Sequence, residues 1–235
     1  MKPLIIIPAR YASTRFPGKP LANINGKSMI MHVFDRAKSF CNNVFVATDD
    51  ERIFDHVLAS GGMAIMTSEK HQSGTDRINE AFGKIENNQN FDIVINLQGD
   101  EPFIEPAQIS ELTNLFSEPE VMIGTLAREI NEMKDITDPN KVKVVFDKNG
   151  KALYFSRSVI PFIRETEKTR YYKHVGIYAF RAEILKKITA IQPCELENTE
   201  KLEQLRWLYN GYNIHLAVTH FDNISVDTPE DLKKL

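Results

Sequence analysis

Two hydrophobic periods alternate along the first half of the chain. Short apolar runs of strand length occur at residues 4–7, 44–47, 63–66 and 92–97. Apolar residues recur with helical spacing at residues 28–40, 50–60, 75–86 and 106–116. Strands that alternate with helices predict an α/β fold, with a mostly parallel central sheet, helices on both faces and a Rossmann-like order.

The pattern changes in the second half. Strand-like runs at residues 141–146 and 152–155 flank the turn sequence Asp147-Lys-Asn-Gly150, which predicts a β-hairpin. The other predicted elements are strands at residues 175–180 and 212–218 and helices at residues 181–189 and 199–209. Because no linker or repeat interrupts the pattern, we predict a single domain over residues 1–235, in which residues 141–218 form a smaller lobe.

The loop after the first predicted strand is rich in cations. Arg10, Arg15 and Lys19 occur there together with Ser13. Open α/β sheets bind ligands at the carboxyl ends of their strands, where cationic side chains can neutralise phosphate charge. The loop lacks the first glycine of a Walker A loop and contains no G-x-G-x-x-G. It therefore predicts a polyphosphate site of another kind, the alternative being a solvated basic loop.

Two aspartates are candidate metal ligands. Asp100 follows the apolar run 92–97, so it should face the same crevice as the basic loop. A carboxylate beside phosphates is repelled unless a cation lies between them, so Asp100 predicts Mg²⁺; the alternative is a turn aspartate. Near the end of the chain, Thr228 to Asp231 read as a helix start, which leaves the preceding Asp227 without a structural explanation.

Composition excludes several classes of partner. A net charge of −3 and a pI of about 6.1 give no reason to expect nucleic acid or an anionic membrane surface. Cys41 and Cys194 are isolated, which argues against a disulfide framework or a zinc site and fits a reducing compartment. No apolar run approaches the ~18 residues of a membrane span, and a core strand begins at residue 4. We therefore expect a cytoplasmic protein.

Seven segments together resemble one enzyme family. The segment IPARYASTRFPGKPL at residues 7–21 resembles the signature loop of the sugar-activating cytidylyltransferases, and most of all that of the 3-deoxy-manno-octulosonate (KDO) cytidylyltransferase family. The other matching segments are HQSGTDR, QGDEP, LYFSR, KHVGIY, LEQLR and VDTPEDL, at residues 71–77, 98–102, 153–157, 173–178, 202–206 and 226–232. The resemblance covers essentially the whole chain.

The resemblance implies a nucleotidyltransferase fold and the reaction of CTP with KDO to give CMP-KDO and diphosphate, for lipopolysaccharide biosynthesis. It implies that the anomeric hydroxyl attacks the α-phosphorus of CTP, with Mg²⁺ on Asp100 and Asp227 and with Lys19 as a further catalytic residue. The nucleotide-binding residues it implies are Ala9, Arg10, Ser13, Arg15, Lys19, Ser73, Arg77 and Gln98. It also implies a homodimer, with the interface supplied by the lobe at residues 141–218.

The same resemblance places the sugar acid in the second half of the chain. The residues implied are Arg157, His174, Tyr178, Glu203 and Gln204. His174 and Tyr178 are four residues apart, which puts them on one face of a strand. From the residues alone, Glu203 and Gln204 are more simply polar side chains on the solvent face of a helix.

The sequence leaves alternatives for the substrate and for the activity. The charged run RETEKTR at residues 164–170 does not match the family, so the sequence does not decide between KDO and an amino-substituted KDO. A sialic-acid-activating relative and a non-catalytic nucleotide-binding regulator are further alternatives. A glycosyltransferase would be expected to carry an Asp-x-Asp motif near a strand end, and none occurs there.

Overall fold

The computed structural model describes residues 1–12, 16–164, 169–222, 226 and 228–232. The chain divides into two compact units, of which one comprises Met1–Ser110 with Asn223–Leu235 and the other Glu111–Asp222. The second unit thus begins earlier than residue 141, where the smaller lobe is predicted to begin. That the two units form a single domain stays a prediction.

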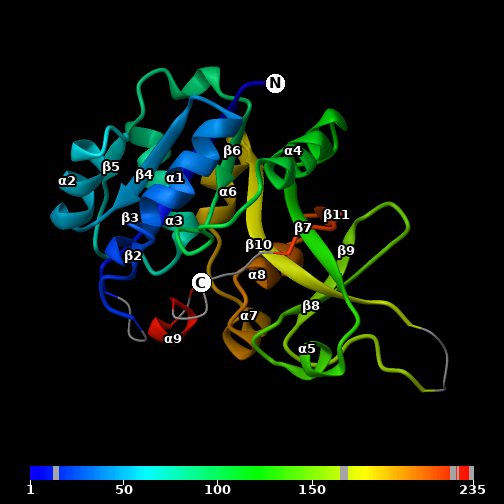
Figure 1. Cartoon of the computed structure of the whole chain (residues 1–235). Coiled ribbons are helices and arrows are strands. Elements are labelled where there is room, and N and C mark those ends of the chain that lie inside the picture. The colour runs from blue at the N-terminus through cyan, green and yellow to red at the C-terminus, as the bar shows by residue number, and fades with distance from the viewer. Residues whose placement is uncertain (13–15, 165–168, 223–225, 227, 233–235) are drawn as a thin grey trace. The chain divides into compact units, whose positions relative to one another are not determined.

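The first unit contains four parallel strands in the order β6-β1-β4-β5 (Figure 1). The strands are β1 (Pro3–Ala9), β4 (Val44–Thr48), β5 (Ala64–Met66) and β6 (Ile93–Asn96). The helices that alternate with them are α1 (Met29–Phe40), α2 (Glu51–Ala59) and α3 (Gly74–Lys84), and α4 (Pro106–Asn114) follows β6. This order confirms the α/β fold that the hydrophobic pattern predicts.

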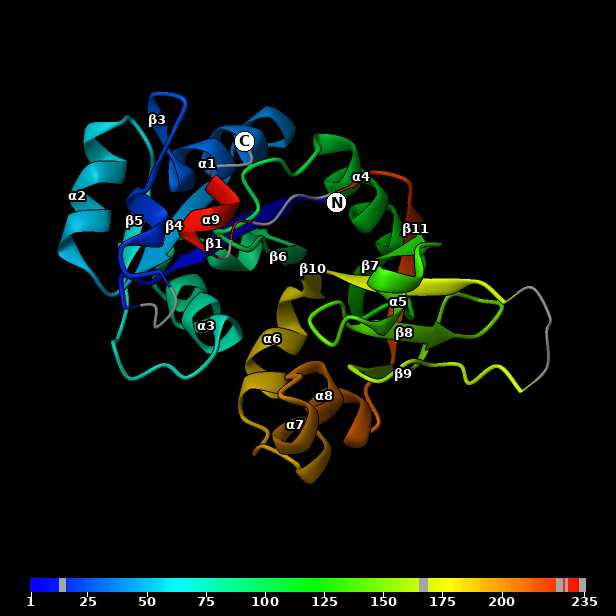
Figure 2. The same cartoon turned by 60° about the horizontal axis from the view of Figure 1, so that its bottom comes forward.

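Burial explains why the strand pattern was so plain. Leu4, Ile5, Ile6 and Ile7 of β1 have no solvent exposure, as expected for a strand covered on both faces. Figure 2 shows α1 and α3 on opposite faces of the pair β1 and β4. The helix starts follow simple chemistry, since the side chain of Asp50 caps α2 by accepting from the Arg52 N–H at 3.0 Å.

Short elements complete the first unit. A two-stranded ribbon, β2 (Asn23–Ile24) and β3 (Lys27–Ser28), leads into α1, and α9 (Pro229–Leu232) lies near the end of the chain. Three-residue 3₁₀-helices occur at Lys19–Leu21 and Asn88–Asn90. The predicted cap of α9 is confirmed, because the Asp231 carboxylate accepts from both the N–H and the hydroxyl of Thr228.

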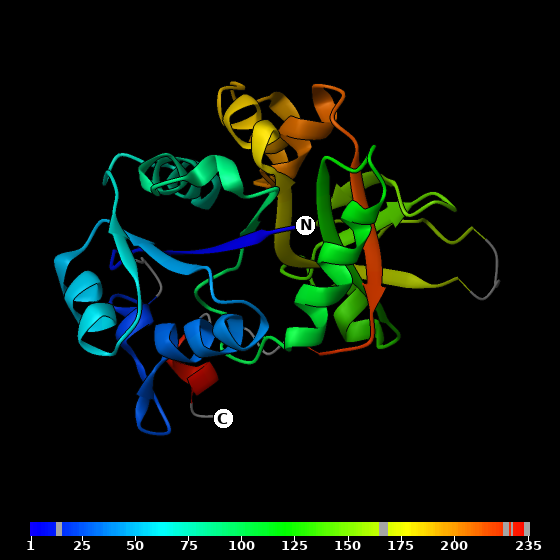
Figure 3. The same cartoon turned by 90° about the horizontal axis from the view of Figure 1, so that it is seen from above.

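The second unit is built on mixed strands. Strand β7 pairs in parallel with β11, as Figure 3 shows, and antiparallel with β10. The predicted hairpin is confirmed as the antiparallel pair β8 and β9. The bounds are β7 (Ile123–Ile130), β8 (Lys143–Phe146), β9 (Ala152–Ser156), β10 (Tyr171–Arg181) and β11 (Ile214–Thr219), with helices α5 (Met133–Thr137), α6 (Ala182–Thr189), α7 (Glu195–Glu200) and α8 (Gln204–Tyr209) and a 3₁₀-helix at Leu115–Ser117.

Two predictions for this unit need correction. The single helix expected at residues 199–209 is wrong, because α7 ends at Glu200 and Lys201 adopts a left-handed conformation with φ of 55°. Strand β7 is absent from the predicted elements, and β10 is longer than the predicted strand at residues 175–180. Within the described residues, no helix is long and apolar enough to cross a membrane.

Candidate active site

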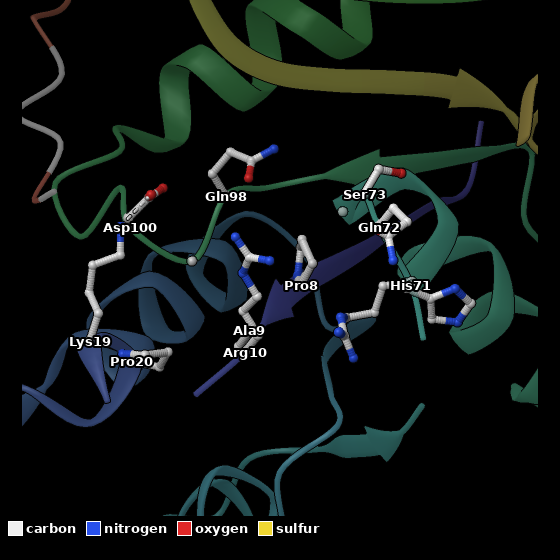
Figure 4. Close-up of a pocket in the computed structure, with 13 residues that line it drawn as sticks. Pro8, Ala9, Arg10, Lys19, Pro20, His71, Gln72, Ser73, Gln98 and Asp100 are labelled. Atoms are coloured by element: carbon white, nitrogen blue, oxygen red, sulfur yellow. Dashed lines mark hydrogen bonds and ion pairs between the residues drawn. The ribbon is translucent and has the colours of Figure 1, made fainter. Parts of the chain in front are cut away.

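A cavity of about 260 Å³ lies in the first unit where β1 and β6 end and α3 begins (Figure 4). It is lined by every predicted nucleotide or metal residue that falls among the described residues, namely Ala9, Arg10, Lys19, Ser73, Arg77, Gln98 and Asp100. The predicted Ser13, Arg15 and Asp227 lie outside the described residues. A site at the carboxyl end of parallel strands is where an open α/β sheet places its ligand.

Opposite charges meet on one side of this cavity. Lys19 Nζ lies 2.7 Å from Asp100 Oδ2, and the two side chains point toward each other in Figure 4. Their side chains keep 15% and 31% of their exposure, so a ligand in the cavity can reach both. The expectation that the basic loop and Asp100 share one crevice is therefore met by Lys19.

Glycine at position 99 lets two chain segments approach closely. A Cβ on Gly99 would lie 3.0 Å from the carbonyl oxygen of Pro8, which is nearer than side-chain carbons normally come to backbone. The segment that carries Asp100 can therefore pack directly against the end of β1.

Arg77 lines the cavity, but its guanidinium group is held by the protein. It donates to Asp49 Oδ2 at 2.6 Å, to Thr67 Oγ1 at 2.6 Å and to the Ser68 carbonyl at 3.4 Å. The side chain is only 4% exposed, and Asp49 neutralises its charge at close range. Arg77 thus ties together the ends of β4 and β5, while its role toward a nucleotide stays a prediction.

Ser73 and His71 line the side of the cavity that lies away from Lys19 and Asp100 (Figure 4). Ser73 caps α3 by accepting from the Asp76 N–H at 3.1 Å, so the helix begins at Gly74, one residue before the predicted start at residue 75. The preceding His71 is bonded through Nε2 to Glu80, whose carboxylate also accepts from Ser68 N–H and pairs with Lys84. Burial disfavours ionisation of Glu80, but these partners outweigh it and lower its pKa to about 2. Glu80 therefore fixes the loop that leads to Ser73.

A segment near the end of the chain contacts Asp100 through Val226. This residue is fully buried against Ile24 and Met29, and its N–H donates to the Asp100 carbonyl at 3.0 Å. The hydrogen bond connects the backbone immediately before Asp227 with the backbone of Asp100.

The donor chemistry can be tested against Mg²⁺. Among the described residues, no three His, Cys, Asp or Glu side chains gather to hold a metal ion. Mg²⁺, however, is commonly held by one or two carboxylates together with substrate phosphates. A partly exposed Asp100 carboxylate in a cavity lined by Arg10 and Lys19 fits that kind of shared site.

The second unit holds a buried polar cluster among aromatic rings. The rings of His174 and Tyr178 lie 5.2 Å apart, and the Tyr178 ring stands edge-on to Trp207, also at 5.2 Å. His174 Nε2 is 2.9 Å from Thr125 Oγ1. Burial lowers the pKa of His174 to about 3, so its imidazole is neutral at physiological pH. The expectation that His174 and Tyr178 share a face is confirmed.

Tyr178 also carries an unusual unsatisfied group. The residue is 7% exposed, and its buried hydroxyl has no hydrogen-bond partner among the described residues. Burial raises the pKa of Tyr178, and the charge of the nearby Glu203 raises it further. An unpartnered buried hydroxyl is costly, which marks this spot as one that a ligand can complete.

Glu203 is the N-cap residue of α8, and Gln204 is the first residue of this helix. Gln204 is 5% exposed, so the interpretation of this side chain as a solvent-facing polar group is wrong. The reason is the break at Lys201, which turns α8 in a direction that a continuous helix would not take.

Arg157 is anchored by backbone carbonyls. Its guanidinium donates to the carbonyls of Glu200 at 2.7 Å, Pro139 at 3.0 Å and Lys201 at 3.5 Å. These bonds hold the end of β9 against α7. These bonds use three of the five N–H donors of the guanidinium group, and a role for Arg157 in binding a sugar carboxylate stays a prediction.

Three residues of these two sites escape the sequence analysis: Asp49, Glu80 and Thr125. Asp49 and Glu80 look like ordinary helix-start and helix-surface carboxylates, since nothing local shows that they pair with Arg77 and His71. Thr125 lies on β7, the strand that the pattern leaves out. The only sequence signal for them is the resemblance of the neighbouring segments to family motifs.

The profile of the family described as Cytidylyltransferase matches residues 4–215 of the chain. The chain belongs to the cytidylyltransferase family. Among curated relatives of this cytidylyltransferase, a 3-deoxy-manno-octulosonate cytidylyltransferase from Thermodesulfovibrio yellowstonii is 52% identical and covers 99% of this chain and 96% of its own length. One of the same name from Parabacteroides distasonis is 49% identical, with 100% and 96% covered.

An 8-amino-3,8-dideoxy-manno-octulosonate cytidylyltransferase from Shewanella baltica is also 49% identical, with 100% of this chain and 97% of its own length covered. A solved CMP:2-keto-3-deoxy-manno-octonic acid synthetase, complexed with CTP, is 45% identical. It has a TM-score of 0.92 and covers 100% of this chain and 96% of its own. These similarities extend over nearly the whole of each protein, so the family resemblance of the individual motifs is confirmed.

Proposed function

We propose that this cytidylyltransferase transfers the cytidylyl group of CTP to KDO, giving CMP-KDO and diphosphate. The main support for this proposal is the similarity, over nearly the whole chain, to enzymes named 3-deoxy-manno-octulosonate cytidylyltransferase. It is combined with a cavity in which Lys19 and Asp100 lie together. In the proposed reaction the anomeric hydroxyl of the sugar acid attacks the α-phosphorus and diphosphate leaves.

The chain's own residues would act by positioning and by charge. Arg10 and Lys19 line the cavity as cations, and we propose that Lys19 exchanges its bond to Asp100 for a phosphate oxygen when CTP binds. There it would offset the charge that develops on the leaving diphosphate. Ser13 and Arg15, on the same loop, would add to this phosphate contact, and the backbone of Ala9 with Ser73 and Gln98 would hold the base.

We propose that Asp100 and Asp227 hold Mg²⁺ for this reaction. When bound, Mg²⁺ supplies Lewis-acid chemistry: it neutralises phosphate charge and lowers the pKa of the attacking hydroxyl. The hydrogen bond from Val226 to Asp100 supports the assignment, because it brings the chain to Asp100 one residue before Asp227. The carboxylate of Asp100 would turn from Lys19 toward the cation.

We propose that the sugar acid binds the cluster of His174, Tyr178, Glu203 and Gln204. We further propose that Arg157, the last residue of the motif LYFSR, binds its carboxylate. The hydroxyl of Tyr178, which has no partner within the part of the chain that the structure describes, and the neutral imidazole of His174 support this, since both can bond to sugar hydroxyls. An 8-amino-substituted KDO is the second candidate substrate, favoured by the equal 49% identity to an enzyme named for it.

We also propose a cytoplasmic homodimer that serves lipopolysaccharide synthesis, as the family resemblance implies. Support for self-association comes from large apolar side chains exposed in the second unit, including Leu153 at 60% and Phe162 at 86%. Measurement of mass in solution would contradict the dimer if the chain were monomeric at micromolar concentration.

The proposed reaction is tested by diphosphate release from CTP and Mg²⁺ with KDO, 8-amino-KDO and a sialic acid. We expect release with KDO and a loss of about 100-fold or more in kcat for Asp100→Asn, the size typical of removing an electrostatic catalytic group. Asp35→Asn is the matched control, because Asp35 forms an exposed ion pair with Lys27 outside the cavity. CTP binding without release for any sugar acid would instead favour a nucleotide-binding regulator.

A further inference from the structure

The hydroxyl of Thr125 occupies a fully buried position between His174 and a bulge in β10. Its Oγ1 lies 2.9 Å from His174 Nε2, 2.8 Å from the Ile177 carbonyl oxygen and 3.2 Å from the Val175 carbonyl oxygen. Thr125 has no solvent exposure. Water therefore cannot replace any of these three contacts.

The bulge explains why two carbonyls face one hydroxyl. In the pairing of β10 with β7, Val175 is opposite Leu126 and Tyr178 is opposite Thr125, so Gly176 and Ile177 have no partner on β7. Such extra residues interrupt the ladder of backbone hydrogen bonds. The Thr125 hydroxyl lies within hydrogen-bond distance of the carbonyls of both Val175 and Ile177, and the bulge keeps His174 and Tyr178 on the same face.

Counting protons assigns the direction of each bond. A hydroxyl has one proton to donate and two lone pairs to accept with, whereas a carbonyl oxygen only accepts. Two oxygens 2.8 Å apart need a proton between them, so Thr125 donates to Ile177. The contact with His174 must then run the other way, with Nε2–H donating to Oγ1. The imidazole is thus the Nε2–H tautomer, and Nδ1 is its acceptor nitrogen.

Resting on the proposed function, in which this cluster holds the sugar acid, we propose that Thr125 is a positioning residue that fixes the tautomer of His174 so that Nδ1 accepts a hydrogen bond from a sugar hydroxyl. A neutral acceptor nitrogen attracts O–H or N–H donors and repels a carboxylate. His174 therefore recognises the polyhydroxyl part of the substrate and leaves its carboxylate to cationic residues.

The environment of the imidazole keeps this arrangement intact. The aromatic rings of Phe155 and Tyr178 lie 5.1 Å and 5.2 Å from the His174 ring. This burial lowers the pKa of His174 to about 3, so protonation does not convert Nδ1 into a donor in the physiological range.

The test compares Thr125→Val, which keeps the side-chain shape and removes the hydroxyl, with Thr125→Ser, which keeps the hydroxyl. The first measurement is ¹⁵N NMR of histidine-labelled protein without substrate, with the His174 signals identified from their loss in His174→Gln. We expect Nε2 to be the protonated nitrogen in wild type and Thr125→Ser, and a shift toward the Nδ1–H tautomer in Thr125→Val. An unprotonated Nε2 in wild type would overturn the assignment.

The second measurement is steady-state kinetics with CTP and KDO. We expect Thr125→Val to raise KM for KDO by about tenfold, the size of one lost hydrogen bond, with KM for CTP unchanged and Thr125→Ser close to wild type. An unchanged KM for KDO in a folded Thr125→Val would overturn the positioning role. If the wild type turned over no sugar acid, the proposed function would fail, and the ¹⁵N measurement would still decide the tautomer.

Discussion

Replacing Arg77 by Met separates a structural role from a role in nucleotide binding. The substitution keeps a long apolar stem and removes three donated hydrogen bonds, to Asp49, Thr67 and Ser68. It also leaves the Asp49 carboxylate, 16% exposed, without the cation that it faces at 2.6 Å. Removing one partner of a buried ion pair costs about 3–5 kcal/mol, because the other charge is left buried and uncompensated.

We therefore expect Arg77→Met to lower the free energy of unfolding by about 3–5 kcal/mol in a denaturant titration. The control is Arg36→Met, which breaks a pair with Glu105 whose side chains are 42% and 41% exposed. Exposed pairs of this kind contribute about 0–1 kcal/mol. Adding Asp49→Asn to Arg77→Met should recover part of the loss, since it removes the orphaned charge.

CTP calorimetry under conditions where the variants stay folded completes the experiment. If Arg77 acts by holding the ends of β4 and β5 in place, the variant that also carries Asp49→Asn should recover part of the site's structure. It should therefore bind CTP more tightly than Arg77→Met alone. A loss of stability below about 1 kcal/mol, together with a strong loss of CTP affinity in both variants, would refute the structural role and place the Arg77 charge on the nucleotide.

Three further predictions concern the two sites. Gly99→Ala should destabilise the protein by about 1–3 kcal/mol, because its Cβ meets the Pro8 carbonyl, whereas Gly83→Ala, in the last turn of α3 with open space around it, should stabilise by about 0.4–1 kcal/mol in the same titration. The pKa of His174 is lowered to about 3 in the folded protein, so as the pH falls the unfolded chain binds a proton at this imidazole before the folded chain does. The contribution of His174 to the free energy of unfolding is therefore complete above about pH 6.5 and should fall by up to about 1.4 kcal/mol per pH unit as the pH drops toward 3. His174→Gln should lack that part of the slope, and an identical slope would contradict the buried neutral imidazole. Lys19→Met should bind Mn²⁺ without CTP more tightly than wild type in calorimetry, because Lys19 competes with a cation for Asp100; equal affinity would count against that competition.

The hydrophobic pattern was sufficient for the first unit. In β1, four consecutive residues have no solvent exposure, and they appear in the sequence as an unbroken apolar run. Such a run is typical of a strand that is covered on both faces. The starts of α2 and α3 lie within one residue of those predicted, because Asp50 and Ser73 cap them through bonds to backbone N–H groups two and three residues away. Such local interactions leave a local signature.

The second unit was harder because its decisive features are not local. The left-handed Lys201 splits a segment that has the spacing of one helix, and lysine is not a residue that predicts this conformation. The bulge at Gly176 depends on pairing with β7, a strand about fifty residues away in sequence. Site residues divide in the same way: Lys19 and Asp100 stand out by charge and position, whereas the partners Asp49 and Thr125 are defined by tertiary contacts alone.

The most direct test of the proposed function is ³¹P NMR of a mixture of this protein, CTP, Mg²⁺ and KDO. We expect the CTP resonances to be replaced by a phosphodiester resonance of CMP-KDO and by diphosphate in equal amounts, and only when KDO is present. CTP that binds the protein but keeps all three of its own resonances, with KDO and with 8-amino-KDO alike, would contradict it.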